Sequence, residues 1–533
     1  MNPVPPRTDP RRTARAVETE LKLAISPAAA ARLRTHPAIR AHARGRPRTT
    51  RVVSTYHDTP DRRLARAGVA LRVRREGRRW LMTVKGEALP GDAMPVTSRP
   101  ELEWTIERPE IDTMRLATTP WRALFAKALR KGGLVPVFVT DFVRTSLPLA
   151  FPDGTAATLA IDLGHVGAGT RRAPIAEIEL ELAGGDPCRL VELATRLAAD
   201  LPVSIEPRSK AERGYALADG IAGEPSRATE VEHADEATAR GAIASIVAGC
   251  VRQIARNSTG LRDASLRDPE WVHQMRIGVR RLRSCLALAD GIVAADALDA
   301  LRRDTRWALD ALGPARDLDV FAQETLPAAM VDLARTGGDA TATVAALRSL
   351  ARRAAARRRA AHAAAVACVS STRCTRLVLA ATAVALSGGT APEGRSDDPG
   401  AEPARRFAAR LLDRRARRLA RAAARLAEAG PDERHAIRIA AKKLRYAAEF
   451  FATLFPRKRS RAYRRALADL QDELGAFNDA TVAPRITAAL AGPTASATVA
   501  VEAWSAARAG ASAPRLADAW ARFAAVAPFW SRG

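Results

Sequence analysis

The 533-residue sequence has few aromatic residues (5%) and only five cysteines, at positions 188, 250, 285, 368 and 374. The cysteines form no CxxC pair and no Cys/His spacing typical of zinc sites, so we expect neither a disulfide framework nor a zinc centre. The sequence also lacks a GxxxxGK[ST] loop, which argues against a P-loop mechanism. No Ser-His-Asp or Cys-His arrangement indicates nucleophilic catalysis.

Long apolar segments are missing as well. No apolar run reaches the length of about 18 residues that a membrane helix needs, and the N-terminal segment MNPVPPRTDPRRTARA has no apolar centre of a signal peptide. We therefore expect a cytoplasmic protein that does not contact a membrane. The phosphate-binding features described below extend this expectation to association with polyphosphate granules.

Positive charge is what the sequence has in excess. The formal net charge is +27 and the isoelectric point is about 11.2. Such a charge favours a polyanionic partner, which could be nucleic acid, anionic lipid or polyphosphate. A chain of this length is expected to contain more than one domain.

Two regions of the sequence differ in hydrophobic period. Up to about residue 215, short segments with alternating hydrophobicity predict a mostly antiparallel sheet or barrel, interrupted by helical patches around 27–44 and 187–200. The predicted strands are 17–23, 69–77, 78–86, 101–107, 138–149, 157–164 and 175–182. Further along, long Ala/Leu/Arg segments with a period of about 3.6 residues predict an all-helical region. The fold class is thus an α+β N-terminal domain, an antiparallel β-barrel or tunnel with flanking helices, followed by an all-α C-terminal domain. We place these domains at 15–218 and 236–525, with a linker at 219–235.

The helical region contains an internal duplication. HQMRIGVRRLRSCLALA begins at His273, and the similar HAIRIAAKKLRYAAEFF begins 162 residues later, at His435. The same spacing relates LGPARDLDV (312–320) to LGAFNDATV (474–482) without a gap. The match predicts two pseudo-repeated helical bundles, at about 236–385 and 404–525.

Each copy carries a cationic stripe along one helix. At 100° per residue, the four basic positions of the first copy fall within one arc, beside an apolar stripe that would pack. The stripes consist of His273, Arg276, Arg280 and Arg283, and of His435, Arg438, Lys442 and Arg445. No acidic residue lies within either helix near these positions, so the stripes either bind an anion, are neutralised by Asp317 and Asp479 folding back, or are solvated faces. Because aromatic residues are nearly absent from the stripes, a phosphate-only ligand is favoured and nucleic acid is an unlikely partner.

The predicted strands place charged residues of both signs on one face. In the first strand, one face carries Glu18, Glu20 and Lys22. Arg72 and Arg74 likewise share a face of their strand, and the last strand has Glu177, Glu179 and Glu181 on one face. A closed barrel with a charged lumen accounts for this pattern more simply than several separately solvated edges. Such a lumen suits a metal-bound polyanion, because carboxylates bind Mg²⁺ or Mn²⁺ and the cations bind phosphate oxygens.

Two family resemblances follow from these segments. VHQMRIGVRRLRSCLAL, LGPARDLDV, HAIRIAAKKLRYAAEFF and LQDELGAFNDATV resemble the two halves of a CHAD domain, which implies binding of inorganic polyphosphate by the two stripes. ETELK, TYHDTPDRRLARAGVALRVRREGRRWLMTVKG, TDFVRT, AIDLG, EIELEL and PRSKAERGYAL resemble the CYTH domain of the triphosphate tunnel metalloenzymes. The whole chain is similar to CYTH-CHAD inorganic triphosphatases.

The CYTH resemblance implies roles for individual residues. Glu18, Glu20 and Lys22 would form the catalytic signature. The metal ligands would be Glu18, Glu20, Asp162, Glu177, Glu179 and Glu181, without deciding which two of the last three approach the metal. The substrate would be held by Arg72, Arg74, Lys85, Arg144 and Lys210.

We therefore expect a metal-dependent triphosphatase that uses Mg²⁺ or Mn²⁺, with inorganic triphosphate as substrate and a polyphosphate-binding helical module. Two alternatives stay open at this point. The tunnel could act on an organic triphosphate, as a thiamine triphosphatase or an adenylate cyclase, or the protein could be a non-enzymatic polyphosphate-binding scaffold.

Overall fold

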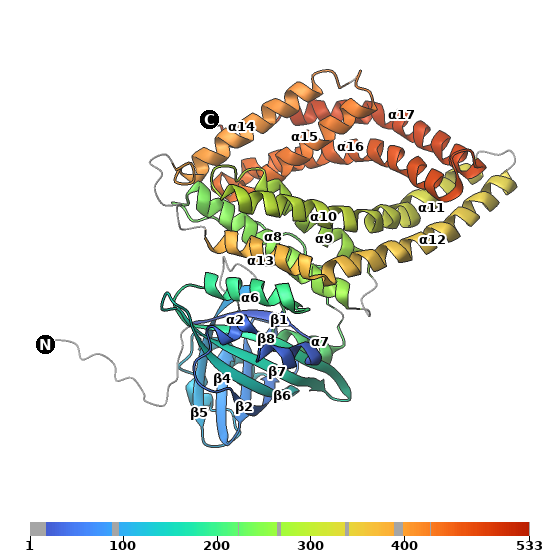
Figure 1. Cartoon of the computed structure of the whole chain (residues 1–533). Helices are drawn as coiled ribbons and strands as arrows, with labels where there is room; N and C mark the ends of the chain where they lie inside the picture. The colour runs from blue at the N-terminus through green and yellow to red at the C-terminus, as the bar shows by residue number, and fades with distance from the viewer. Residues whose placement is uncertain are drawn as a thin grey trace. The chain divides into compact units, whose positions relative to one another are not determined.

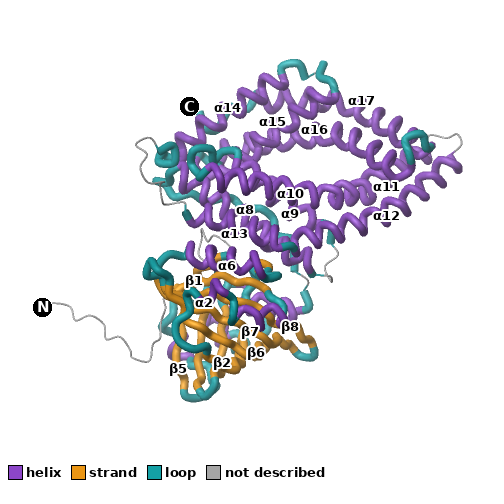
Figure 2. Tube along the Cα trace, in the orientation of Figure 1, coloured by secondary structure: helices purple, strands orange, loops and turns teal. Residues whose placement is uncertain are grey.

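The computed structural model describes residues 17–87, 95–221, 223–263, 268–335, 340–387, 398–426 and 428–531. The chain forms two compact units (Figures 1 and 2), one of strands and helices and one of helices alone. The first unit comprises Met1–Pro225 and Ser370–Leu386, and the second comprises Ser226–Val369 and Ser387–Gly533. The predicted fold class is confirmed. The domain boundaries that we placed at 15–218 and 236–525 stay predictions.

The first unit is a closed antiparallel barrel of eight strands. Its neighbouring strands follow the order β5-β4-β3-β2-β6-β7-β8-β1, and pairing of β1 with β5 closes the ring. The strands are β1 (Val17–Ala24), β2 (Arg48–Asp58), β3 (Ala70–Glu76), β4 (Arg79–Lys85), β5 (Val96–Ile106), β6 (Val135–Ala150), β7 (Ala156–Ala168) and β8 (Arg171–Gly184). A two-residue strand, β9 (Ser204–Ile205), adds to the edge of β1.

Strand β2 is the barrel strand that our sequence pattern did not predict. Its buried face carries Val52, Ser54, Tyr56 and Asp58, which alternate with the half-buried Val53, Thr55 and His57. A hydrophobicity pattern cannot detect such a strand, because both of its faces are partly polar.

Apolar residues on the outer face of the barrel pack under helices. Leu71, Met82 and Trp104 point outward from β3, β4 and β5 into a core with Leu116 and Phe125. The helices of this unit are α1 (Pro27–Leu33), α2 (Pro37–Arg40), α3 (Arg63–Arg66), α4 (Thr113–Leu116), α5 (Arg122–Arg130), α6 (Cys188–Asp200), α7 (Lys210–Asp219) and α13 (Thr372–Leu386). Because the apolar side chains face outward, the charged side chains of the same strands face the lumen.

Helix α13 belongs to the barrel unit although it lies far along the chain. It packs on α6, and the Thr375 hydroxyl donates a hydrogen bond to the Val203 carbonyl (3.0 Å) just before β9. Leu377 and Leu379 are fully buried. The first unit is therefore discontinuous in sequence.

The second unit consists of two related sets of helices (Figure 1). The first set is α8 (Ala239–Arg262), α9 (Glu270–Leu286), α10 (Ala295–Val320), α11 (Leu326–Arg335) and α12 (Ala340–Ser370). The second set is α14 (Ala404–Ala423), α15 (Pro431–Phe450), α16 (Arg457–Ala491) and α17 (Ser496–Ala524). The spacing of 162 residues also separates one pair of helix starts, since α10 begins at Ala295 and α16 at Arg457.

Within the described residues, no single helix is long and apolar enough to cross a membrane. Helices α12 and α13 reach that length and composition only when they are taken together across the break between them.

Candidate active site and cationic surface

Cross-strand register brings the charged residues of the barrel strands onto its inner face. Lys22 of β1 lies opposite Glu179 of β8, and Asp162 of β7 lies opposite both Glu177 of β8 and Arg144 of β6. Directly opposed residues of an antiparallel pair point to the same face, so this row of charges continues around the lumen. On the other side, Lys85 of β4 lies opposite Glu101 of β5.

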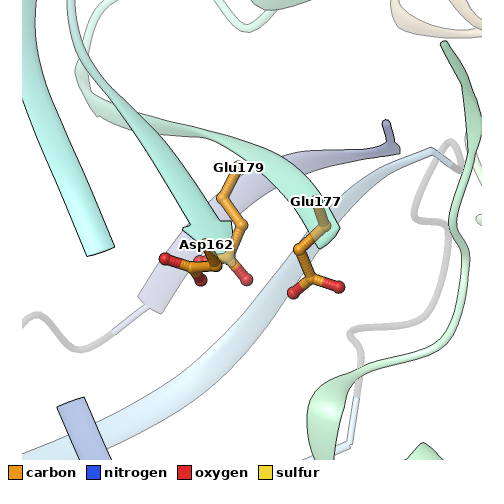
Figure 3. A group of neighbouring side chains, drawn as sticks. All are labelled: Asp162, Glu177 and Glu179. Carbon is orange, nitrogen blue, oxygen red and sulfur yellow. The ribbon is translucent and has the colours of Figure 1, made fainter. Parts of the chain in front are cut away.

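Three carboxylates converge within this lumen, and we call Asp162, Glu177 and Glu179 the acidic triad. Each offers an oxygen atom within 4.8 Å of the other two. Figure 3 shows the three carboxylates on the neighbouring strands β7 and β8. The side chains are 0%, 1% and 11% exposed, respectively. Three buried carboxylates this close repel one another strongly unless cations lie between them.

Basic side chains provide that compensation. The Lys210 ammonium, from the start of α7, lies 2.7 Å from Asp162 Oδ2 and 2.9 Å from Glu179 Oε1, and it also contacts Glu177. Arg144 donates to both Asp162 oxygens (2.8 and 2.6 Å) and to Glu179 (2.5 Å). Arg213, one turn after Lys210, pairs with the remaining Glu177 oxygen at 2.5 Å.

This network keeps Asp162 and Glu179 charged. Burial alone would favour the neutral acids, but the charges of Lys210 and Arg144 outweigh this effect. They lower the pKa of Asp162 and hold the pKa of Glu179 well below its usual value. Burial would likewise favour neutral Lys210, yet Asp162, Glu177 and Glu179 raise its pKa above the usual range. Asp162 and Glu179 are therefore anionic at neutral pH, which is the state that binds a divalent cation.

The N-terminal signature lies on the same lumen but outside the triad. Glu18 accepts a hydrogen bond from Lys85 (2.5 Å), and Glu20 pairs with its own neighbour on the strand face, Lys22 (2.6 Å). Glu181 lies opposite Glu20 in the register of β1 and β8, two residues beyond Glu179 on β8. Of the three alternating glutamates, Glu177 and Glu179 are thus the two that meet Asp162.

Arginines from β3 and β5 line the opposite wall. The guanidinium of Arg74 pairs with Glu103 (2.5 Å), and that of Arg72 lies 3.7 Å from Glu101 and 3.3 Å from the Tyr56 hydroxyl. The Nε atoms of Arg72, Arg74 and Arg99 are buried and have no hydrogen-bond partner among the described residues. Buried donors without partners are rare in folded proteins, so these groups point to an anionic ligand.

Sequence reasoning left several of these residues out. From the sequence no role was assigned to Glu101, Glu103, Arg99, Arg213 or Tyr56. Arg99 continues the alternation of Glu101 and Glu103 on β5, and Arg213 lies one helical turn after Lys210. These two spacings are the signals that could have identified them.

One part of the lumen is apolar and filled. Tyr56 of β2 stacks on Phe138 of β6 (ring centroids 4.4 Å apart), and Tyr215 of α7 meets the same ring edge-on. Phe142 and Val166 join this cluster. The close approach of α7 depends on Gly214, because a Cβ atom there would lie 2.0 Å from a Phe138 ring carbon. The packing of α7 on this cluster is what positions Lys210 and Arg213 at the acidic triad.

In the helical unit, the two predicted stripes meet. Burial and the positive charges of Arg438, Arg280 and Arg276 lower the pKa of Lys442 to about 7. Burial, Arg276 and Arg445 likewise lower the pKa of Arg280. Residues of α9 and α15 therefore lie close enough to repel one another and form one cationic surface. We call this surface, which consists of Arg276, Arg280, Arg438, Lys442 and Arg445, the central stripe.

Three members of the predicted stripes behave differently. Arg276 is partly neutralised, because its guanidinium lies 3.0 Å from Asp317 and 2.9 Å from the Gly313 carbonyl. The expected equivalent, Asp479, lies outside the residues whose side chains are described. Arg445 likewise lies 3.3 Å from Glu449. Arg283 is exposed, and its charge lowers the pKa of Lys443 rather than that of Lys442. His273 is half-buried and His435 exposed.

Comparison with known families assigns both units. The model of the CYTH domain matches residues 16–215, and the model of the CHAD domain matches residues 245–488. The curated inorganic triphosphatase of Haemophilus influenzae is 33% identical over 206 residues, which is 38% of this chain and 54% of that protein. The chain thus spans about half the length of this relative.

Two solved structures are similar to separate parts of the chain. The CHAD domain from the plant Ricinus communis is 31% identical, with a TM-score of 0.48, and the match covers 57% of this chain and 98% of that one. A Hippeastrum adenylyl cyclase candidate with a dominant triphosphatase activity is 19% identical, with a TM-score of 0.28, over 37% of this chain and 95% of that one.

Proposed function

We propose that this chain, a CYTH domain followed by a CHAD domain, hydrolyses inorganic triphosphate with the help of a divalent metal and binds inorganic polyphosphate through its helices. One observation carries the proposal. The barrel lumen holds three converging carboxylates opposite buried arginine donors that lack a partner. Carboxylates for a metal beside free guanidinium donors are what a metal-bound phosphate chain requires.

The acidic triad fits Mg²⁺ or Mn²⁺ by its chemistry, because all its donors are hard carboxylate oxygens. Asp162, Glu177 and Glu179 would hold one ion, and Glu18 and Glu20 on the adjacent strand β1 are available for a second. When bound, the metal supplies charge neutralisation on the transferred phosphoryl group and lowers the pKa of a water molecule.

The basic side chains bind and orient the phosphate chain. Arg72 and Arg74 reach it from β3, Arg99 from β5 and Lys85 from β4, while Arg144 and Lys210 lie at the triad. Forked guanidinium groups fix phosphate oxygens in a defined direction, which aligns the bond to be broken with an attacking water. Burial of the site strengthens each of these contacts.

Every lumen cation except Arg99 is paired with a carboxylate or hydroxyl in the structure. Lys85 holds Glu18, Arg74 holds Glu103, and Lys210 holds the triad. A metal that binds the carboxylates releases the cations for phosphate, and phosphate that binds the cations releases the carboxylates for metal. Metal and triphosphate should therefore bind cooperatively.

Two observations support the inorganic substrate over thiamine triphosphate or ATP. The Haemophilus relative that matches the barrel region is named an inorganic triphosphatase. In addition, the aromatic rings of the lumen, Tyr56 and Phe138, are stacked on each other rather than open to clamp an organic group. The helical unit would hold polyphosphate on the central stripe, beside an enzyme that acts on short phosphate chains.

The experiment is phosphate release by the purified protein from inorganic triphosphate, thiamine triphosphate, ATP and long-chain polyphosphate, with and without Mg²⁺ or Mn²⁺. Metal-dependent release from inorganic triphosphate alone is the expected result. Faster phosphate release from an organic triphosphate, or formation of cyclic AMP from ATP, would show that inorganic triphosphate is not the preferred substrate. No turnover of any substrate, together with tight polyphosphate binding, would make the protein a scaffold.

A further inference from the structure

A second group of cations lies beside the central stripe. It consists of Arg283 of α9, Lys443 of α15, and Arg415 and Arg418 of α14, and we call it the α14 cluster. The Arg415 guanidinium donates to the Lys443 carbonyl oxygen at 2.6 Å, which joins α14 to α15. Burial and the charges of Arg418, Arg415 and Arg283 lower the pKa of Lys443, so the four side chains lie within electrostatic range of one another.

Within the described part of the chain, no carboxylate pairs with any member of the α14 cluster. Other exposed arginines of the same region are neutralised: Arg410 lies 2.5 Å from Glu402 and Arg425 lies 2.7 Å from Glu428. Burial, Arg414 and Arg418 lower the pKa of Arg415 to about 10, so desolvation and repulsion outweigh the one opposing influence, that of Cys285. An arrangement that raises the energy of its own cations is expected where an anion binds.

The α14 cluster is distinct from the central stripe. Lys442 and Lys443 are adjacent on α15, so their side chains point about 100° apart around the helix. The charges that act on Lys442 are those of Arg438, Arg280, Arg276 and Arg445, whereas those that act on Lys443 are Arg418, Arg415 and Arg283. The two sets share no member.

The first half of the duplication differs at two positions of this cluster. At the same spacing of 162 residues, the buried Ala242, Ile246 and Cys250 of α8 correspond to the buried Ala404, Ala408 and Leu412 of α14. Arg415 then corresponds to Gln253, a neutral residue that is buried and hydrogen-bonded to Gln274 (3.1 Å).

Lys443 corresponds in the same way to Arg281, which is buried and paired with Glu449 at 2.6 Å. At these two positions the first half therefore has a neutral or an acid-paired residue, whereas Arg415 and Lys443 have no carboxylate partner among the described residues. The position of Arg418 is basic in both halves, as Arg256 in the first.

We propose that the α14 cluster is a second anion-binding site, which holds a stretch of the polyphosphate chain that the central stripe binds. This inference rests on the proposed polyphosphate binding. Four cations on one surface suit a chain of phosphates, and the position of Lys443 next to Lys442 lets one chain run from the stripe over α15. The aromatic residues of α9, α14 and α15, namely Trp271, Phe407, Tyr446 and Phe450, are all buried. Without an exposed aromatic ring for base stacking, polyphosphate is favoured over nucleic acid.

The test compares two triple variants of the full-length chain that lose the same charge. The site variant is Arg283→Gln, Arg418→Gln and Lys443→Gln; Arg415 is left intact because it holds α14 to α15. The control variant is Arg406→Gln, Arg417→Gln and Arg425→Gln, three exposed arginines that are paired with acids. Affinity for long-chain polyphosphate is measured at several salt concentrations.

The site variant should bind at least about tenfold more weakly than the control, and its affinity should depend less on salt, by about 0.7 in logarithmic slope for each lost contact. Equal affinity and equal salt dependence of the two variants would overturn the second site. A third variant, Arg276→Gln with Arg280→Gln and Lys442→Gln, changes the central stripe. It distinguishes an error about the second site from an error about polyphosphate binding by the helical unit. If the stripe variant also binds like the wild type, polyphosphate binding by the helical unit is itself wrong.

A second measurement needs no variant. Acetylation of lysine amines followed by mass spectrometry reports whether Lys443 is covered, with the exposed Lys458 of α16 as the internal control. Long-chain polyphosphate should protect Lys443 and leave Lys458 reactive. Unprotected Lys443 in the presence of saturating polyphosphate would contradict the proposal, and equal protection by single-stranded RNA would contradict the choice of ligand.

Discussion

The Lys210 ammonium lies 2.7 Å from Asp162 Oδ2, in the middle of the carboxylates that would hold a metal. A divalent ion must displace this ammonium before it can bind all three side chains. Lys210→Met should therefore strengthen Mn²⁺ binding in the absence of triphosphate by about tenfold or more, a change of at least about 1.4 kcal/mol. Calorimetry measures this affinity, and weaker Mn²⁺ binding by the variant would show that Lys210 supports the metal site instead. Triphosphate turnover should fall in the same variant, because the phosphate loses a cation.

Glu18 and Glu20 should be needed for turnover but not for the fold. We expect Glu18→Gln and Glu20→Gln to lower the rate of triphosphate hydrolysis by about 100-fold or more each, because an amide cannot supply a charged metal ligand. Steady-state phosphate release measures the rate. Glu107→Gln, at an exposed position just after β5, should keep full activity and serves as the control. Full activity of the Glu18 and Glu20 variants would remove both residues from the site.

Asp317 and a bound phosphate compete for the same guanidinium. Because Asp317 lies 3.0 Å from Arg276, Asp317→Asn should release Arg276 and strengthen polyphosphate binding severalfold. Asp310→Asn removes the same charge from an exposed position on α10 and reports the general electrostatic effect. Equal gains in the two variants would mean that the Arg276 pair is not part of the binding surface.

Polyphosphate affinity should depend on pH through Lys442. The unliganded helical unit holds the pKa of Lys442 at about 7, against a usual value of 10.5. Bound phosphate favours the charged amine and raises this pKa, so binding takes up a proton between the two values. Affinity should therefore fall as the pH rises from about 7 toward 10.5 and should be level below about 7. Binding isotherms across this range measure the effect, and Lys442→Met should flatten it while Lys458→Met should not.

The position of α7 depends on one glycine. Gly214→Ala should destabilise the barrel unit by a few kcal/mol, about 2–3 by analogy with overpacked cores, since the new Cβ would lie 2.0 Å from the Phe138 ring. The unfolding free energy from urea titration tests this expectation. Gly475→Ala in α16 meets no atom within 4 Å and should instead stabilise its helix by about 0.5–1 kcal/mol. An unchanged stability of Gly214→Ala would show that α7 can shift away from Phe138.

Alternation and helical period predicted much of the architecture. Glu18, Glu20 and the three glutamates of β8 were placed on one inner face because a strand has a period of two residues. Strand β2 was missed, since its inner face mixes Val52 with Ser54 and Tyr56 and gives no hydrophobic period. The helical wheel grouped Arg276, Arg280 and Arg283, but it could not show that the charges of Arg276 and Arg280 lower the pKa of Lys442 while that of Arg283 lowers the pKa of Lys443, because a wheel contains no neighbouring helix.

The convergence of the site required information that no local pattern holds. Which two of Glu177, Glu179 and Glu181 meet Asp162 follows from the register of β7 on β8. Arg213 and Lys210 enter the site only because α7 packs on the aromatic cluster around Phe138. Register and packing of this kind depend on contacts between residues that are far apart in sequence.

The discontinuous make-up of the barrel unit has a consequence for synthesis on the ribosome. All eight barrel strands are made before residue 185, but α13 follows only after α8–α12 have left the exit tunnel. Until then the apolar side of α6 that α13 covers stays open to water or to a chaperone. A fragment that stops at Pro225 would keep this state permanently and should be prone to aggregate, so the barrel and its last helix are best produced as one uninterrupted polypeptide.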